Sequence, residues 1–509
     1  MSEPDGPVRP IAAGLARYAG LAGAVLLTAA GWLGGALPGT PPRGTLAAIW
    51  HAPYGPAALA CWLAGTLLLV GAWWSLRWGA PSGRWAYVTA GLWSLPLLAA
   101  PPIGSRDVYS YACQGWTWTQ GLSPYRVGVA AAGCPWTDSV SPIWRDTPAP
   151  YGPFFVLLAG LAVLAGGGLI GTIVALRLVA VAGVLLTALC LPGLARAAGV
   201  PTRRAAWLVL ACPLVGIHLV AGAHNDALAL GLLLLGLLVL VRLPGKPRAL
   251  LVAGVLLGLA VAVKAVAVVA LPFAALAAVL GRYTWRALLR DGGQLAASVL
   301  GTLLVVSLAT GLGLGWVGGL GHSGDSQQWT SPPTAVGFVI DYAGELAGLR
   351  PQAVPVVRAV ALVLLAATLV ALWWWAWTRL RRLNDVRQRV ARLTLARPRV
   401  ALLGAGLALA ATVLLAPVFH PWYAIWPLTV LAVAAVPLAR QVWFVAPCAV
   451  ASLLTLPDGS NLARFSKAPG AVLMTVLDER GEQQAEVGAA QDGAHRFPPA
   501  GVRHQGRVG

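Results

Sequence analysis

Residues 151–204 read YGPFFVLLAGLAVLAGGGLIGTIVALRLVAVAGVLLTALCLPGLARAAGVPTRR, and this stretch decides how the chain is expected to fold. Its central part, residues 168–193, is long and apolar enough to cross a bilayer as one helix. The three arginines between residues 196 and 204 follow that span, and such residues mark the cytoplasmic side. If residues 151–167 crossed as well, these arginines would lie outside. We therefore expect 151–167 to form an amphipathic helix in the outer interface without crossing.

Apolar runs of similar length recur along most of the chain. Of its 509 residues, 58% are hydrophobic and 10% are charged, and the mean hydropathy is +0.74. This composition is typical of a protein that crosses the membrane many times. The first run has no clean cleavage site, so we expect a span and not a signal peptide. The sequence predicts an all-α polytopic protein with about 13 transmembrane helices, with 12 to 14 possible. The expected spans are residues 14–36, 55–78, 85–101, 168–193, 205–222, 226–242, 249–265, 266–281, 293–315, 353–378, 399–417, 422–438 and 442–457.

The formal net charge of +19 raises the question of a nucleic-acid partner. Most of the 36 basic residues, however, lie in short segments that fall on one side of the predicted spans. The positive-inside rule makes that side cytoplasmic, so we expect no nucleic-acid partner. Four regions are expected. They are N-terminal spans with a cytoplasmic N-terminus (1–101), an outer catalytic loop with two juxtamembrane helices (102–167), a transmembrane core that includes an outer loop at 316–352 (168–457), and a polar, disordered tail (458–509).

The first outer loop contains a polar segment, residues 102–153, which we call the polar island. The chain has only 17 acidic residues, and Asp107, Asp138 and Asp146 all lie in the island. Asp107 is the strongest candidate for a general base, because it follows a span at the start of a short helix predicted at 107–121. A carboxylate there is close to lipid headgroups and open to a polar acceptor. The simpler alternative is that Asp107 caps this helix or is only solvated.

Two sets of basic residues could bind a phosphate. Arg106, Arg126 and Arg145 share the polar island, where they could bind an anion or only neutralise its acids. Lys264 interrupts an apolar run, and an ionisable group inside a span is a functional candidate. Its expected partner is a lipid phosphate, and snorkelling of the side chain to the interface is the alternative.

Further candidates lie at the ends of later spans. The tripeptide His224-Asn225-Asp226 begins a span, where the helix N-terminus could bind an anion, or Asn225 or Asp226 could simply cap the helix. His420 lies between two spans and could add a donor to a phosphate. The loop 316–350 is long enough to be a lid over an outward-facing site, or it is an ordinary mobile loop.

Six cysteines are present, and two of them, Cys113 and Cys134, fall in the polar island. They could form a disulfide, which an exterior environment permits, or remain two free thiols. The other four lie in apolar runs and are expected to be small buried side chains. No Cys or His spacing typical of zinc is present, so no metal site is predicted, although a divalent metal is possible.

Several motifs occur in a fixed order, namely SRDVYSY at 105–111, SPYRVG at 123–128, WRDTPAPYGP at 144–153, LVAGAHND at 219–226, Lys264, WTSPPT at 329–334 and PWY at 421–423. Together they resemble actinobacterial polyprenol-phosphomannose-dependent α-1,6-mannosyltransferases, which are membrane glycosyltransferases of the GT-C class. The resemblance extends over roughly residues 85–460, and the island motifs are its most specific part.

The resemblance implies a lipomannan-forming enzyme. Mannose would pass from a polyprenyl-phosphate donor to a lipid-linked α-1,6-mannan, by one inverting displacement, on the extracytoplasmic face of the cell membrane. Asp107 would be the base. Cations would stabilise the departing phosphate, with Lys264 first, followed by Arg145, His224, His420 and Arg358. Sugar and acceptor binding would fall to Tyr109, Trp144, Asp146, Asp226, His322 and Trp329. Membrane lipids are expected partners, and no cofactor or protein partner is expected.

Other functions remain open from the sequence. The same fold could transfer another sugar, such as arabinofuranose, because the walls of the pocket cannot be read from the residues. A transporter or lipid flippase would also have many spans and charge within the membrane, but it would show repeat symmetry and helices broken at the midplane, and neither is clear here. A non-catalytic membrane scaffold is a further alternative.

Overall fold

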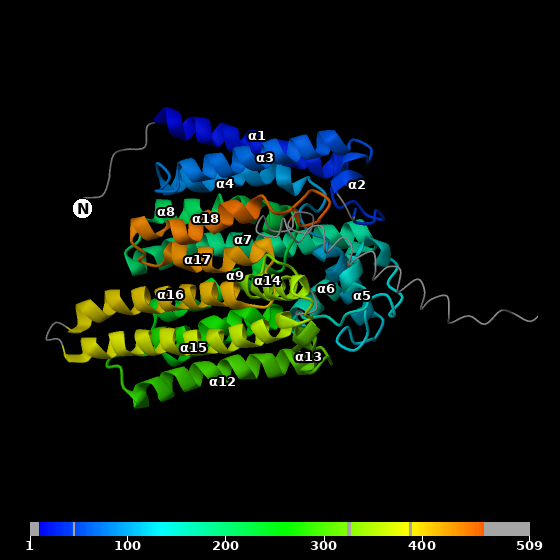
Figure 1. Ribbon diagram of the computed structural model, residues 1–509. Coiled ribbons are helices and arrows are strands. Elements are labelled where there is room, and N and C mark those ends of the chain that lie inside the picture. The colour runs from blue at the N-terminus through cyan, green and yellow to red at the C-terminus, as the bar shows by residue number, and fades with distance from the viewer. Residues whose placement is uncertain (1–9, 44–45, 323–326, 386–388, 463–509) are drawn as a thin grey trace, which may run out of the picture.

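A computed structural model describes residues 10–43, 46–322, 327–385 and 389–462. Within these ranges the chain is helical, and its only extended pairing is a single antiparallel bridge between Thr455 and Asn461. The long helices lie side by side and nearly parallel (Figure 1). The short helices α2, α5, α6 and α13 gather at one end of this bundle, which we call the loop end (Figure 1).

In the first half of the chain, the residues that the structure describes form nine α-helices. They are α1 (Pro10–Gly34), α2 (Leu46–Trp50), α3 (Gly55–Ser75), α4 (Gly83–Leu98), α5 (Asp107–Thr119), α6 (Pro153–Gly166), α7 (Leu169–Ala198), α8 (Thr202–Leu210) and α9 (Asp226–Arg242). Two short 3₁₀ turns, η1 (Thr137–Ser139) and η2 (Pro142–Trp144), lie in the polar island, and a π-helix, η3 (Val215–Ala221), follows α8.

The described residues of the second half form another nine α-helices. They are α10 (Pro247–Val263), α11 (Leu271–Ala278), α12 (Trp285–Ala309), α13 (Gly315–His322), α14 (Pro332–Leu346), α15 (Ala353–Arg382), α16 (Arg389–Leu415), α17 (Ile425–Val433) and α18 (Val442–Ser452). The 3₁₀ turns η4 (Ala265–Ala270), η5 (Leu383–Asp385), η6 (Pro421–Ala424) and η7 (Leu438–Arg440) connect them.

Six helices of the described chain are long and apolar enough to cross a membrane. They are Ile11–Gly34, Gly55–Ser75, Leu169–Ala198, Trp285–Ala309, Ala353–Arg382 and Ala396–Leu415, and α8 with η3 makes a seventh if this bent pair is one span. The protein is therefore a multi-pass, all-helical membrane protein, but the expected count of about 13 spans is not confirmed. Several expected spans are shorter helices, because the chain breaks within the apolar run, as it does at Lys264 between α10 and η4.

The two helices expected at the outer interface are present, with a different character. α6 is a short helix as predicted, but it is not amphipathic, since Leu161 and Leu164 are exposed and equally apolar residues face inward. α5 is mostly buried and does not lie on the surface. Its Gly115 packs so closely on α6 that an added Cβ would lie 2.4 Å from the carbonyl carbon of Ala159. This contact between small residues holds α5 inside the loop end.

A disulfide between Cys113 and Cys134 decides the alternative that the sequence left open. Cys113 lies in α5 and Cys134 in the polar island, and their Cα atoms are 5.6 Å apart. The other four cysteines are free, and three of them are buried while Cys61 is half-buried. The disulfide therefore ties the outer part of the island to the helix that begins with Asp107.

We expect Cys113→Ser to destabilise the loop end. The disulfide closes a segment with a sequence separation of 21, and cross-links of this size contribute about 3 kcal/mol in the chain-entropy description. The measurement is the thermal unfolding of the purified protein in detergent. Cys61→Ser is the matched control and should unfold like the wild type. Equal unfolding temperatures for Cys113→Ser and the wild type would contradict the expectation.

Candidate active site

Four polar side chains from three helix ends meet at the loop end. Asp107 is the first residue of α5, His224 and Asp226 lie at the start of α9, and Lys264 follows the last residue of α10. Nδ1 of His224 lies 3.9 Å from Oδ2 of Asp107 and 3.7 Å from Oδ2 of Asp226. Nζ of Lys264 lies 2.6 Å from Oδ2 of Asp226. We call these four residues the acid–lysine cluster.

The chain reaches His224 through a broken helix. α8 and the π-helix η3 meet at an angle of 64°. Ala223 then adopts a φ of 53°, a left-handed conformation that side-chain-bearing residues rarely take and that is concentrated at functional sites. The His224 N–H donates to the carbonyl of His218 at 3.1 Å, which closes the turn. As a result the His224 ring is fully buried against the two carboxylates.

Lys264 lies where α10 ends in an extended residue, with φ −147° and ψ 122°. Gly152 makes this end part of the site, because its N–H donates to the carbonyl of Val263 at 3.3 Å. A Cβ at Gly152 would lie only 2.3 Å from the carbonyl oxygen of Ala262. The close approach brings the Tyr151 ring to 5.9 Å from the Lys264 ammonium. Because the contact is with main-chain atoms, only glycine fits at position 152.

Asp226 is a fully buried carboxylate with both oxygens in use. Oδ2 accepts from Lys264 and Oδ1 accepts from Nε1 of Trp426, each at 2.6 Å. Asp226 therefore holds Lys264, and its contact with sugar stays a prediction. Asn225 caps α9 by position, but its side chain makes no capping hydrogen bond.

Asp107 has the free carboxylate of the cluster. Its main-chain N–H donates to Oγ of Ser105 at 3.0 Å, which holds the start of α5. Its side chain is 12% exposed, and within the described chain its oxygens accept no hydrogen bond. The two neighbouring carboxylates thus differ in their surroundings, because Asp226 is paired with a cation and Asp107 accepts no hydrogen bond from the described residues.

Three histidines surround the ring of Trp422. The His218 and His224 centroids lie 5.1 and 4.4 Å from it, and the His420 ring stacks on it at 4.6 Å with an interplanar angle of 4°. Burial lowers the pKa of His420 to about 4, so this residue is neutral near pH 7. A neutral His420 can donate an N–H to an anion.

Tyr109 and Arg145, which were predicted to bind ligands, both donate hydrogen bonds to main-chain carbonyls. Tyr109 is fully buried and its hydroxyl donates to the carbonyl of Ala36, so the structure does not support its predicted contact with sugar. Arg145 donates to the carbonyls of Val140 and Asp138 at 3.2 and 3.1 Å, within the polar island. It makes no hydrogen bond or ion pair with the acid–lysine cluster in the described chain.

The other predicted residues belong to the polar island, to α13, to the segment before α14 and to α15. Arg358 of α15 donates from Nε to Oγ1 of Thr334 at 2.9 Å, and Thr334 in turn donates to the carbonyl of Pro417, close to His420. Trp144 is half-buried and Asp146 exposed in the island, while Trp329 is half-buried before α14. The side chain of His322 and all of residues 463–509, including most of the predicted tail, lie outside the described residues.

The segment expected to be a lid is tied to the chain before η6. Oγ1 of Thr330 donates to the carbonyl of Phe419 at 3.2 Å, and Oγ of Ser331 donates to that of Ala416 at 2.9 Å. These bonds bring the motif at 329–334 beside the motif at 421–423.

Two features of the site differ from what the sequence predicts. Trp426 falls inside the span expected at 422–438, but its indole N–H donates to Asp226. Residues 458–462 fall in the tail expected to be disordered, but Asp458 is only 2% exposed and Ser460 only 8%. The sequence Pro457-Asp458-Gly459-Ser460 is a strong turn signal, and it could have indicated order.

Fold and site together define a class of protein, a multi-pass helical membrane protein with an open carboxylate beside a buried lysine–carboxylate pair at one end of the bundle. Such a site can accept a proton and stabilise an anion. A family model described as "Alpha-(1->6)-mannopyranosyltransferase, N-terminal domain" matches residues 17–280, which contain the whole cluster. A second, described as "MptB C-terminal domain", matches residues 333–478. The chain belongs to the alpha-(1->6)-mannopyranosyltransferase family.

Individual relatives agree with this assignment. An alpha-(1->6)-mannopyranosyltransferase of Mycobacterium tuberculosis is 34% identical over 396 residues, which cover 67% of this chain and 64% of the relative. A probable alpha-(1->6)-mannopyranosyltransferase of Mycolicibacterium smegmatis is 36% identical over 381 residues, covering 68% of this chain and 64% of the relative. Alpha-(1->6)-mannopyranosyltransferase A of Mycobacterium tuberculosis is 35% identical, and the match covers 70% of that relative. The chain thus spans just under two thirds of the length of the first two. No solved structure matches it.

Proposed function

We propose that this protein transfers mannose from a polyprenyl-phosphate donor to an α-1,6-mannan lipid. The observation that carries the proposal is the arrangement of two carboxylates around His224. The Asp107 carboxylate accepts no hydrogen bond from the described residues, and the Asp226 carboxylate holds Lys264. Family membership supports the sugar and the linkage, since the relatives carry that activity in their names. The GT-C assignment remains a prediction from the sequence motifs.

In the proposed reaction, Asp107 accepts the proton of the acceptor 6-hydroxyl as its oxygen attacks the anomeric carbon. The bond between that carbon and the donor phosphate oxygen breaks, and its electron pair leaves with the polyprenyl phosphate. Lys264 stabilises the negative charge on the departing phosphate. One displacement inverts a β-linked donor to an α product, so no covalent enzyme intermediate is needed.

Asp226 holds Lys264 in place for this step. A lysine side chain can adopt many rotamers, and the 2.6 Å ion pair with Asp226 fixes one of them beside the two aromatic rings. The Tyr423 and Tyr151 rings lie 5.2 and 5.9 Å from the ammonium, and a cation over an aromatic face is attracted to it. His224, between the two carboxylates, separates the proposed base from the occupied acid.

We place the site on the extracytoplasmic side of the membrane. The basic residues that follow α7 and α9 are expected in the cytoplasm, which puts the loop end on the opposite side. The Cys113–Cys134 disulfide at this end favours an oxidising compartment. A lipid-linked donor in the outer leaflet could then reach Lys264 from within the membrane.

Reconstitution tests the function. The full chain in liposomes, supplied with polyprenyl-phosphomannose and an α-1,6-mannoside acceptor, should form a longer product whose new linkage is α-1,6. Replacing the donor by polyprenyl-phosphoarabinofuranose tests the related sugar. Movement of donor across the bilayer without product would instead indicate a flippase and would reject the proposal.

A further inference from the structure

The last described residues of the chain form a loop that packs against the residues before Asp107. This loop, residues 455–461, follows α18, and we call it the C-terminal strap. Its ends pair through the Thr455–Asn461 bridge, and its turn is closed by the Leu456 N–H, which donates to the carbonyl of Ser460 at 2.9 Å. Gly459 has a φ of 89°, which glycine adopts without strain.

The carboxylate of Asp458 organises the strap from inside. It accepts from the N–H and the hydroxyl of Ser460, both at 3.0 Å, and from the Arg43 N–H at 3.3 Å. Asp458 is 2% exposed. A buried carboxylate with three donors around it is a strong local constraint, and its loss would leave those donors without their acceptor.

The strap is joined directly to the residue before Asp107. Nε of Arg106 donates to the carbonyl of Asp458 at 3.2 Å, and its two other nitrogens donate to the carbonyl of Ser139 and to Oγ1 of Thr40. Arg106 is 3% exposed, so its guanidinium is a fixed internal joint. The strap thus meets the start of α5 through one buried side chain.

The backbones of the two segments also touch. A Cβ on Gly459 would lie 3.1 Å from the carbonyl carbon of Ser105, and a Cβ on Gly104 would lie 3.3 Å from Oγ1 of Thr455. Ser105 in turn accepts the hydrogen bond from the Asp107 N–H. The strap therefore covers the two residues whose conformation sets the start of α5.

Two anchors keep the strap in place. The indole of Trp62 in α3 donates to the carbonyl of Thr455 at 2.7 Å. The amide of Asn461 donates to Oε1 of Gln328 at 3.3 Å, which links the strap to the segment before α14. The strap thus connects the base-bearing loop with both the N-terminal helices and the second outer loop.

We propose that the C-terminal strap positions Asp107, with Asp458 as the positioning residue and Arg106 as the joint between them. The inference rests on the proposed role of Asp107 as base. Asp458 is not a catalytic residue, since its oxygens are all used within the strap and with Arg43. Loosening the strap changes where the Asp107 carboxylate points while leaving donor and acceptor binding intact.

The first test is kinetic and uses the full chain in liposomes. Asp458→Ala should lower kcat per folded molecule by about tenfold to a hundredfold with KM for both substrates unchanged, because small displacements of a catalytic group have effects of this size. Asp458→Asn should restore most of the rate, since its amide oxygen can still accept from the Ser460 N–H. Ser460→Ala, a milder change that removes only the hydroxyl, should give an intermediate loss. Asp138→Asn, an exposed acid of the polar island, is the control and should match the wild type.

The second test reports on the strap without using activity. A thiol introduced as Ser105→Cys should be protected from maleimide, as Ser105 is 3% exposed, and should become reactive when Asp458→Ala is added. The chain without Ser105→Cys gives the background from native thiols. A protected thiol in the Asp458→Ala protein, or an unchanged kcat when the thiol is exposed, would overturn the proposal.

The two hypotheses fail in different ways. If Asp107 is the base and the strap acts through it, adding Asp458→Ala to Asp107→Asn causes no further loss of rate. An additional loss in the double variant would show that the strap acts by another route and would reject the positioning role. Full activity of Asp107→Asn alone would reject the base, whatever the labelling of Ser105→Cys shows.

Discussion

We expect Asp107→Asn to lower the rate of the proposed mannose transfer by about 10²- to 10⁴-fold, the range that positioned proton acceptors contribute. The amide has the size and shape of the carboxylate but cannot take a proton at neutral pH. The variant should fold normally, because the Asp107 side chain accepts no hydrogen bond in the described chain and its N–H keeps its bond to Ser105. Donor binding, measured with radiolabelled polyprenyl-phosphomannose, should stay near the wild-type level.

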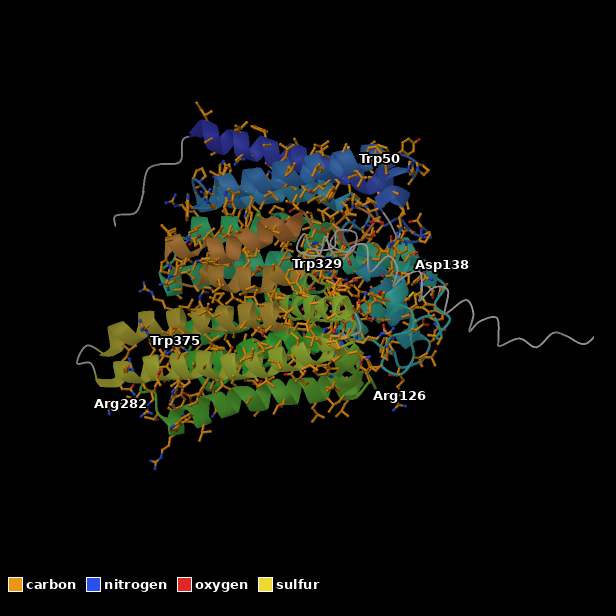
Figure 2. The ribbon with its side chains drawn as sticks, in the orientation of Figure 1. Trp50, Arg126, Asp138, Arg282, Trp329 and Trp375 are labelled. Carbon is orange, nitrogen blue, oxygen red and sulfur yellow. A yellow bond between two sulfur atoms is a disulfide. The ribbon has the colours of Figure 1, made fainter. Side chains whose placement is uncertain are left out.

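Asp138→Asn is the matched control for this experiment. Asp138 is an acid of the same polar island, and it is exposed at the outer edge of the loop end (Figure 2). The same chemical change there should leave the rate within about twofold of the wild type, as is usual for exposed positions away from special features. A near-wild-type rate for Asp107→Asn would mean that the base lies elsewhere.

Lys264→Met abolishes transfer and also destabilises the protein. It leaves the Asp226 carboxylate fully buried without its cation, and breaking a buried ion pair costs about 3–5 kcal/mol. In the proposed reaction it also removes the charge that stabilises the departing phosphate. Loss of activity in this variant alone therefore cannot separate folding from catalysis.

A double variant separates the two effects. With Asp226→Asn added to Lys264→Met, no buried charge is left unpaired, and the amide oxygen at position 226 can still accept from Trp426. Thermal stability should return toward the wild type while transfer remains lost. Arg126→Gln, which removes an exposed cation of the island, is the control and should change neither quantity (Figure 2). Recovery of activity in the double variant would show that Lys264 has only a structural role.

The sequence was sufficient for much of this description. Apolar runs and scarce charge predicted an all-helical membrane protein, because only helices and barrels satisfy the backbone within lipid. Position in the chain was enough to single out Asp107 and Lys264, since each is a rare charged residue beside or inside an apolar run. The helix predicted at 107–121 and the short helix within 151–167 were also found, as α5 and α6.

Roles that depend on distant partners could not be read from the sequence. The sequence predicts that Asp226 binds sugar. In the structure its carboxylate accepts hydrogen bonds from Lys264, 38 residues away, and from Trp426, 200 residues away. Tyr109 looked like a ligand in a polar motif, but it is buried and donates to Ala36. The expected count of about 13 spans is not confirmed, because breaks inside apolar runs, such as the one at Lys264, leave helices shorter than a full span and have no strong compositional signal.

The sequence by itself therefore determined the class of fold and which charged residues are exceptional, since both follow from composition and local order. Only the tertiary structure decided how these charges are used. It pairs Asp226 with Lys264, leaves Asp107 open, and lays the C-terminal strap over Ser105 and Arg106. The physical reason is that the free energy of a buried charge depends on the atoms packed around it, and those come from helices far apart in the chain.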